Sequence, residues 1–178
     1  MRLDTFSSAD FDRSASRATE ALWLLLSGLF VASWLPGSGW RVRLLRAFGA
    51  RIGTGVVMKP SVQIKFPWRL TVGDHTWIGE GVWIDNLAEV HIGSHVCISQ
   101  GAYLCTGSHD WNKESFDLIT RRIVLNDHSW VGAKSIIAPG TKIGDGAVLA
   151  MAGLAKGELK SWTVYAGNPA SAVRSRQT

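Results

Sequence analysis

The sequence is poor in cysteine, with only Cys97 and Cys105 among its 178 residues. Two cysteines cannot form the disulfide framework of a small secreted protein, and neither belongs to the closely spaced pair of a structural zinc site. A chain of this length suits a single domain. The cysteine usage therefore fits a reducing compartment, and we expect a cytoplasmic protein.

The sequence also lacks a hydrophobic run long enough to cross a bilayer. Its longest apolar segment, residues 21–35 (ALWLLLSGLFVASWL), is shorter than the ~20 residues that a spanning helix needs. Acidic residues precede it, unlike the basic start of a signal peptide. Trp23, Trp34 and Trp40, followed by arginines, suit a membrane interface. The same segment also suits a helix that covers an open end of the fold or packs between subunits, so both interpretations remain open.

Acidic residues are outnumbered by basic ones, 14 to 19, which gives a net charge of +5 and a pI of about 9.6. A basic protein favours acidic partners, such as a phosphorylated coenzyme or the anionic inner surface of a membrane. No recognised nucleic-acid-binding module is present, so we expect no nucleic-acid partner.

What the sequence has is a six-residue period of aliphatic residues with glycine or alanine beside them. Its longest series are Val72, Ile78 and Ile84; Ile92, Ile98 and Leu104; and Leu125, Val131, Ile137, Ile143 and Leu149. This period is typical of a parallel β-helix, in which three hexads form one triangular coil and equivalent positions recur every eighteen residues. A β-sandwich would instead show a period of two. We therefore predict an all-β solenoid, whose handedness the period does not give.

The pattern divides the chain into three parts. Residues 1–50 form an N-terminal helical segment, and residues 51–154 form the coils. Residues 107–122 interrupt the coils as a projecting loop. Residues 155–178 form a tail with a short helix, because Asn168-Pro169 resembles an N-cap followed by proline at the first helical position.

A histidine lies where the coil pattern breaks off. The sequence Thr106-Gly-Ser-His109-Asp follows the Leu104 hexad, so the His109 side chain can face a groove rather than the core of its own coil. An imidazole with a pKa near neutrality is well suited to take a proton from a hydroxyl group. His109 is therefore the candidate catalytic residue.

These motifs carry a resemblance to a known family. The run from Cys97 to Asp110 (CISQGAYLCTGSHD) and the ending Tyr165-Ala-Gly-Asn-Pro-Ala170 are more specific than the hexad repeat alone. With them the chain resembles the hexapeptide-repeat acetyltransferases, which are left-handed β-helix enzymes that use acetyl-CoA. It is most similar to the colanic acid biosynthesis acetyltransferases of bacterial exopolysaccharide pathways.

The resemblance implies an O-acetyltransferase that moves the acetyl group of acetyl-CoA directly to a sugar hydroxyl. It also implies a homotrimer with active sites between neighbouring subunits. His109 takes the role of general base, and Asp85 that of a contact to the acceptor. No metal ion is expected. Related enzymes acetylate amino sugars or xenobiotics with the same frame, so the acceptor remains open.

The resemblance further implies a coenzyme site. Its expected members are Trp130, Ala133, Ala152, Gly153, Lys156 and Arg174. Trp130 would line the groove, the small residues would admit the pantetheine arm, and Arg174 would meet phosphate. The family commonly has a Thr-Lys pair after the last coil, but this chain has Lys156-Gly157 there, which leaves the phosphate contacts in doubt.

A zinc-dependent carbonic anhydrase of β-helix fold is the competing interpretation. His75, His95 and His128 follow the inward residue of their hexads by three places, so they recur on one face, one coil apart. The outer two would be about 9.6 Å apart, twice the coil rise. One column therefore cannot close around a single ion at a Zn–N distance of about 2.0 Å, although ligation between subunits remains open.

Overall fold

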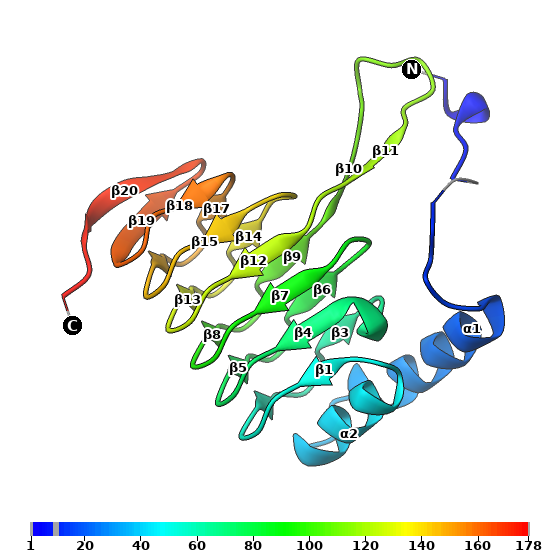
Figure 1. Cartoon of the computed structure of the whole chain (residues 1–178), viewed down its shortest axis with the longest axis horizontal. Coiled ribbons are helices and arrows are strands. Elements are labelled where there is room, and N and C mark those ends of the chain that lie inside the picture. Colours follow the sequence, from blue (N-terminus) through cyan, green and yellow to red (C-terminus); the bar gives the residue numbers. More distant parts are fainter. Residues whose placement is uncertain (1, 9–10, 178) are drawn as a thin grey trace.

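The computed structural model describes residues 2–8 and 11–177, and its body is a solenoid of short parallel strands (Figure 1). Three parallel sheets run along it. The first sheet holds β1 (Arg51–Ile52), β4 (Leu70–Val72), β7 (Val90–Ile92), β12 (Ile123–Leu125), β15 (Lys142–Ile143) and β18 (Glu158–Leu159). The second holds β2 (Val57–Met58), β5 (Trp77–Ile78), β8 (Cys97–Ile98), β13 (Trp130–Val131), β16 (Val148–Leu149), β19 (Thr163–Gly167) and β20 (Ala170–Ser175). The third holds β3 (Gln63–Ile64), β6 (Trp83–Asp85), β9 (Tyr103–Cys105), β14 (Ile136–Ile137) and β17 (Leu154–Ala155).

The core consists of columns of aliphatic side chains, as the six-residue period predicts. In the first sheet Ile52 pairs with Val72, which pairs with Ile92, and the equivalent inward residues of the other sheets are also in register. Nearly all of them are buried. Each such side chain contributes about 1.5–3 kcal/mol through removal from water. The fold is thus the left-handed parallel β-helix that the resemblance implied.

The repeat length differs from the eighteen residues expected. Equivalent residues of the first coils are twenty apart, as for Ile52 and Val72. The eighteen-residue spacing appears only in later coils, as for Leu125 and Ile143 or Val131 and Leu149. Glycines after the inward residues allow close approach between coils. A Cβ on Gly73 would lie 2.6 Å from the backbone of Gly93 and Ser94 in the next coil. Glycine is therefore needed there for space between coils.

The interruption at residues 107–122 is a projecting β-hairpin. Its strands are β10 (Gly107–His109) and β11 (Leu118–Thr120), which pair antiparallel with His109 opposite Leu118. The hairpin leaves the solenoid after β9 and stands out from its side (Figure 1). This hairpin lies at the position where the sequence pattern predicts a projecting loop, and it carries His109 away from the core.

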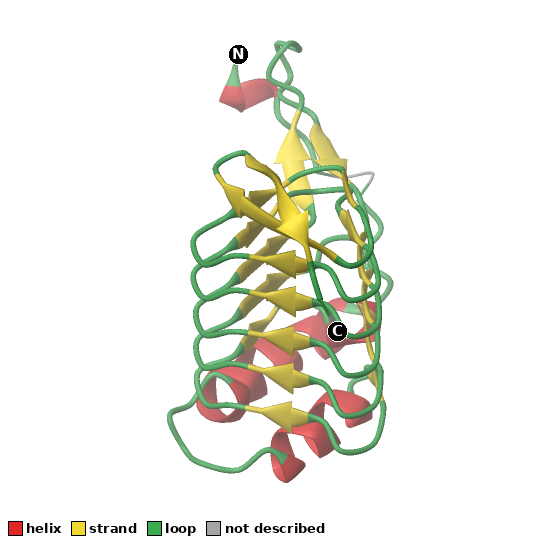
Figure 2. Cartoon of the chain, turned by 90° about the vertical axis from the view of Figure 1, so that its left-hand side faces the viewer, coloured by secondary structure: helices red, strands yellow, loops and turns green. Residues whose placement is uncertain are grey.

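Helices cover the N-terminal end of the solenoid (Figure 2). They are α1 (Arg17–Leu26), which continues as a π-helical turn η2 (Ser27–Val31), and α2 (Gly39–Ala47). Short 3-10 turns form at η1 (Leu3–Thr5) and η3 (Pro67–Arg69). In the part of the chain that the structure describes, no helix is both long enough and apolar enough to cross a membrane.

The C-terminal helix predicted from Asn168-Pro169 is wrong. That dipeptide lies in the turn between β19 and β20, which pair antiparallel. Asn-Pro also suits a turn, and here strand pairing decides between the two. The coils also continue beyond residue 154, through β17, β18 and β19. Strand β20 then covers the open edge of β19.

Candidate active site

His109 is held by the tip of its own hairpin. Its Nδ1 lies 2.8 Å from the carbonyl oxygen of Phe116, and the two rings stack with centroids 4.2 Å apart and planes inclined by 2°. A carbonyl oxygen can only accept a hydrogen bond, so Nδ1 carries the proton and donates it. This tautomer leaves the lone pair on Nε2 for a reacting group.

The N-terminal segment adds a second aromatic contact to His109. The Phe6 ring lies with its edge toward the imidazole, at a centroid distance of 5.5 Å. The segment is held beside the hairpin, because the Arg2 backbone N–H donates to the Glu114 carbonyl at 2.8 Å. His109 is thus half-buried between two phenylalanines, one from a segment that sequence reasoning did not assign to the site.

The hairpin forms one wall of a groove of about 420 Å³, here called the hairpin groove. His109 lies in it with Asp110 and Trp111, and the facing wall comes from the corners of later coils. That wall includes Ala138, Pro139 and Lys156. The structure therefore brings Lys156 to the same groove as His109, together with Arg121.

Other predicted coenzyme residues line a separate groove of about 760 Å³, here called the tryptophan groove. It holds Trp130, Ala133 and Arg174 on the second sheet and its adjoining corner. Trp130 is 47% exposed, and its indole N–H donates to the Ser99 hydroxyl at 2.9 Å. The lining of the groove is mostly apolar, and Arg174 and Arg176 contribute its basic side chains.

Two of the predicted coenzyme residues do not line either groove. The backbone N–H of Ala152 donates to the Ala133 carbonyl at 2.9 Å, whereas Gly153 is buried and a Cβ there would meet the Leu149 side chain. Met151 faces the tryptophan groove in their place, as does Arg176. The hexad pattern could have identified Met151, since it lies two positions after the inward Leu149 and so falls outside the core column.

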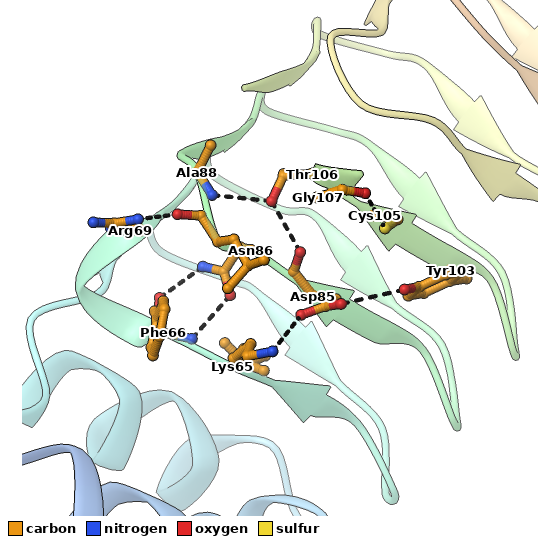
Figure 3. Close-up of polar contacts among 12 residues, drawn as sticks. Lys65, Phe66, Arg69, Asp85, Asn86, Ala88, Tyr103, Cys105, Thr106 and Gly107 are labelled. Atoms are coloured by element: carbon orange, nitrogen blue, oxygen red, sulfur yellow. Dashed lines mark hydrogen bonds and ion pairs between the residues drawn. The ribbon is translucent and has the colours of Figure 1, made fainter. Parts of the chain in front are cut away.

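Asp85 lies in a polar cluster on the third sheet (Figure 3). Tyr103 donates its hydroxyl to the Asp85 carboxylate at 3.2 Å, and Lys65 Nζ lies 3.2 Å from the other carboxylate oxygen. Burial and the neighbouring Cys105 and Asp85 raise the pKa of the Tyr103 phenol. Asp85 is outside the described linings of both grooves, so its contact to the acceptor remains a prediction.

The same cluster fixes the base of the hairpin. The buried Thr106 hydroxyl donates to the Asp85 carbonyl at 3.0 Å and accepts from the Ala88 N–H at 3.0 Å. The Asn86 side-chain amide, beside Asp85, accepts from the Phe66 N–H and donates to the Phe66 carbonyl in the preceding coil (Figure 3). The backbone leading into β10 is therefore fixed, and with it the approach of His109 to its groove.

The histidine column exists as the spacing predicts. The rings of His75 and His95 stack at 5.3 Å, and those of His95 and His128 at 5.2 Å. Parallel rings direct their nitrogens side by side, so they do not converge on one point. Across residues 2–8 and 11–177, no three His, Cys, Asp or Glu side chains lie together in a way that could hold a metal ion.

Comparisons with known proteins agree with this architecture. The chain is 40% identical over 176 residues to the putative colanic acid biosynthesis acetyltransferase of Escherichia coli (strain K12), covering 98% of this chain and 96% of that one. A solved hexapeptide-repeat-containing acetyltransferase from Vibrio cholerae is 27% identical, with a TM-score of 0.81 over 92% of this chain and 96% of that chain. A second structure of such an acetyltransferase, complexed with acetyl coenzyme A and from Vibrio cholerae O1 biovar eltor, has 24% identity and a TM-score of 0.82, covering 97% and 93%. No family model matches the chain.

The coiled fold is that of a hexapeptide-repeat acetyltransferase, an acyl-transferring enzyme. Within that class, the chain belongs to the family of the colanic acid biosynthesis acetyltransferases.

Proposed function

We propose that the protein is an acetyl-CoA-dependent O-acetyltransferase that modifies a sugar hydroxyl in exopolysaccharide biosynthesis. The observation that carries the proposal is the state of His109, whose Nδ1–H is bound to the Phe116 carbonyl while Nε2 remains available at a groove. Family membership supports the acyl transfer. The complex of a structural relative with acetyl coenzyme A supports the choice of donor.

The reaction needs one proton acceptor and no covalent enzyme intermediate. The acceptor hydroxyl gives its proton to His109 Nε2 as its oxygen attacks the thioester carbonyl carbon. The tetrahedral intermediate then collapses, the C–S bond breaks, and the proton passes from His109 to the departing thiolate. The products are an acetyl ester and free coenzyme A, and the imidazole returns to its starting state.

Cys105 does not supply a better nucleophile. Its thiol donates to the Gly107 carbonyl at 3.1 Å, so the sulfur is engaged at the base of the hairpin. An acetyl-enzyme at this position would require the thiolate. Direct transfer assisted by His109 therefore accounts for the reaction more simply.

The tryptophan groove suits the coenzyme. Trp130 offers an aromatic wall and Ala133 a small corner against which a pantetheine arm can lie. Arg174 and Arg176 add positive charge to the lining of this groove, and the Arg174 guanidinium can meet phosphate oxygens, whereas Arg176 Nη1 already donates to the carbonyls of His128 and Gly146 at 2.9 Å. Lys156, in the hairpin groove, supplies positive charge there in place of the family's Thr-Lys pair.

The separation of the two grooves on one chain is explained by a homotrimer. The second and third sheets each present large, exposed apolar side chains, namely Trp77, Trp83, Trp130 and Ile136. The first sheet instead presents Arg51, His91, Lys142 and Glu158. Two apolar faces and one polar face suit a closed ring of three chains, in which each second sheet meets a neighbour's third sheet. A neighbour's tryptophan groove would then complete the site at His109.

The test is to incubate the purified protein with acetyl-CoA and a panel of glycosides and to follow free thiol. Thiol release that depends on a glycoside, with an O-acetylated product by mass spectrometry, is the expected result. An amino sugar that becomes N-acetylated in preference would replace the proposed acceptor class. Carbon dioxide hydration by a zinc-loaded protein, without any thiol release, would establish the carbonic anhydrase alternative instead.

A further inference from the structure

The helical N-terminal end carries an unusual density of exposed apolar side chains. Those exposed by two fifths or more are Leu22, Leu24, Leu25, Leu29, Phe30, Trp34 and Leu35. Leu24 is 63% exposed and Trp34 is 79% exposed. They belong to α1, η2 and the loop that follows. A contiguous group of exposed apolar side chains of this size indicates an interaction site.

These side chains are not needed to cover the end of the solenoid. From α1 and η2 only Trp23 and Val31 are buried. The Trp23 indole donates to the Ile64 carbonyl at 3.0 Å, and its ring packs on Phe48 at 5.1 Å. The expectation that Trp23 belongs to an exposed interface is therefore wrong. The helix buries only one narrow edge, and its wide apolar face is exposed.

The loop that presents Trp34 and Leu35 is held in place by hydrogen bonds from Arg41. The buried Arg41 guanidinium donates to the carbonyl oxygens of Val31, Ser33, Leu35 and Gly37 at 3.1, 2.8, 2.5 and 2.6 Å. Burial lowers the pKa of this guanidinium, which still remains charged at neutral pH. Because the loop is already ordered, binding through Trp34 costs less conformational entropy than binding through a mobile loop.

The charge around this apolar surface has one sign. Between residues 17 and 59 the sequence has six basic residues and one acidic residue, Glu20. The Glu20 carboxylate is already paired with Arg13 at 2.6 Å, whereas Arg17 and Arg43 are exposed. A second copy docked face to face would bring together two basic surfaces, which repel each other. An anionic lipid surface supplies the opposite charge and an apolar layer at once.

We propose that the surface formed by Leu22, Leu24, Leu25, Leu29, Phe30, Trp34 and Leu35, here called the docking face, binds an anionic membrane. The helix lies in the headgroup region, since it is too short to span the bilayer. The exposed leucines and Trp34 enter the boundary of the acyl chains while the arginines meet the headgroups. The solenoid then stands on the membrane by its N-terminal end. This inference does not depend on the identity of the acceptor.

The test is sedimentation of the full-length protein with vesicles made of equal parts phosphatidylglycerol and phosphatidylcholine. We expect binding at low salt, weaker binding at high salt, and little binding to pure phosphatidylcholine. Leu29→Gln and Trp34→Ala should each lower the membrane partition coefficient about tenfold, because each removes one apolar side chain that would be buried in the membrane. Arg43→Gln should weaken it to a smaller extent.

Matched controls keep the test specific. Val173→Gln removes an exposed apolar side chain at the far end of the chain, and Lys160→Gln removes one positive charge there, so neither should change binding. Wild-type protein that stays in the supernatant at low salt would overturn the proposal. So would Trp34→Ala binding as tightly as the wild type. A change of oligomeric state in Trp34→Ala, measured by light scattering, would show instead that the docking face meets another copy.

Discussion

The imidazole of His109 contacts Phe116 at two points, its backbone carbonyl and its ring. The Nδ1–H donates to the Phe116 carbonyl at 2.8 Å, and the phenyl ring lies parallel to the imidazole at 4.2 Å. Phe116 has a left-handed backbone conformation, with φ of 52°. One residue therefore fixes both the tautomer and the plane of the proposed base.

Phe116 should act as a positioning residue. Phe116→Leu removes the stacked ring but retains the carbonyl, so we expect kcat to fall about tenfold through misalignment of the base, with little change in KM for acetyl-CoA. Phe116→Tyr keeps the ring and should retain most of the activity. Steady-state kinetics on both variants provide the measurement. Equal losses in the two variants would indicate a general effect on the fold.

Trp130 should contribute to coenzyme binding. Trp130→Ala removes the aromatic wall of the tryptophan groove, and we expect KM for acetyl-CoA to rise about tenfold, or about 1.4 kcal/mol, with a smaller change in kcat. Trp34→Ala serves as the control, because Trp34 is exposed at the opposite end of the molecule. An unchanged KM in Trp130→Ala would remove Trp130 from the coenzyme site.

The sequence predicts the coils well because every hexad must meet the same packing requirements. An inward aliphatic residue must match the one in the next coil, and a glycine must allow the two backbones to approach, as at Gly73. The turn residues were missed for the opposite reason. Thr76 and Thr141 are buried polar residues whose hydroxyls bond to backbone carbonyls, so they carry no hydrophobic signal.

The site was predictable only in part. The break in the repeat located His109, but Phe6 is more than a hundred residues away in sequence and no local pattern links the two. Arg174 was expected on a helix and is found on β20, still beside the tryptophan groove. Asn168-Pro169 fits a helix start and a hairpin turn equally well, and only the pairing of β20 with β19 decides between them.

The assembly should depend on the apolar faces. Ile136→Glu places a charge on the third sheet, where a neighbouring chain would bury it, so we expect a trimer in the wild type and dissociation with loss of activity in the variant. His91→Glu places the same charge on the polar first sheet and should leave the assembly intact. Light scattering measures both. A stable and active wild-type monomer would contradict the proposed shared site.

Stability at alkaline pH should depend on Tyr103. Burial raises the pKa of this phenol above the value of about 10 for an unfolded chain, so the folded state holds the proton more tightly. This contribution to the free energy of unfolding is complete below about pH 10 and is lost as the pH rises through the folded pKa. Tyr103→Phe should therefore show a weaker decline in stability above pH 10, measured by urea unfolding. Parallel declines in the two proteins would contradict this role.

The central claim is that His109 is the general base of acetyl transfer. The most direct measurement is glycoside-dependent release of free coenzyme A by wild type, His109→Ala and Cys105→Ser. We expect His109→Ala to lose about 10²–10⁴ in kcat while it keeps the trimer and its affinity for acetyl-CoA, and Cys105→Ser to retain substantial activity. Turnover by His109→Ala close to that of the wild type would contradict the account, as would complete inactivity of a folded Cys105→Ser protein.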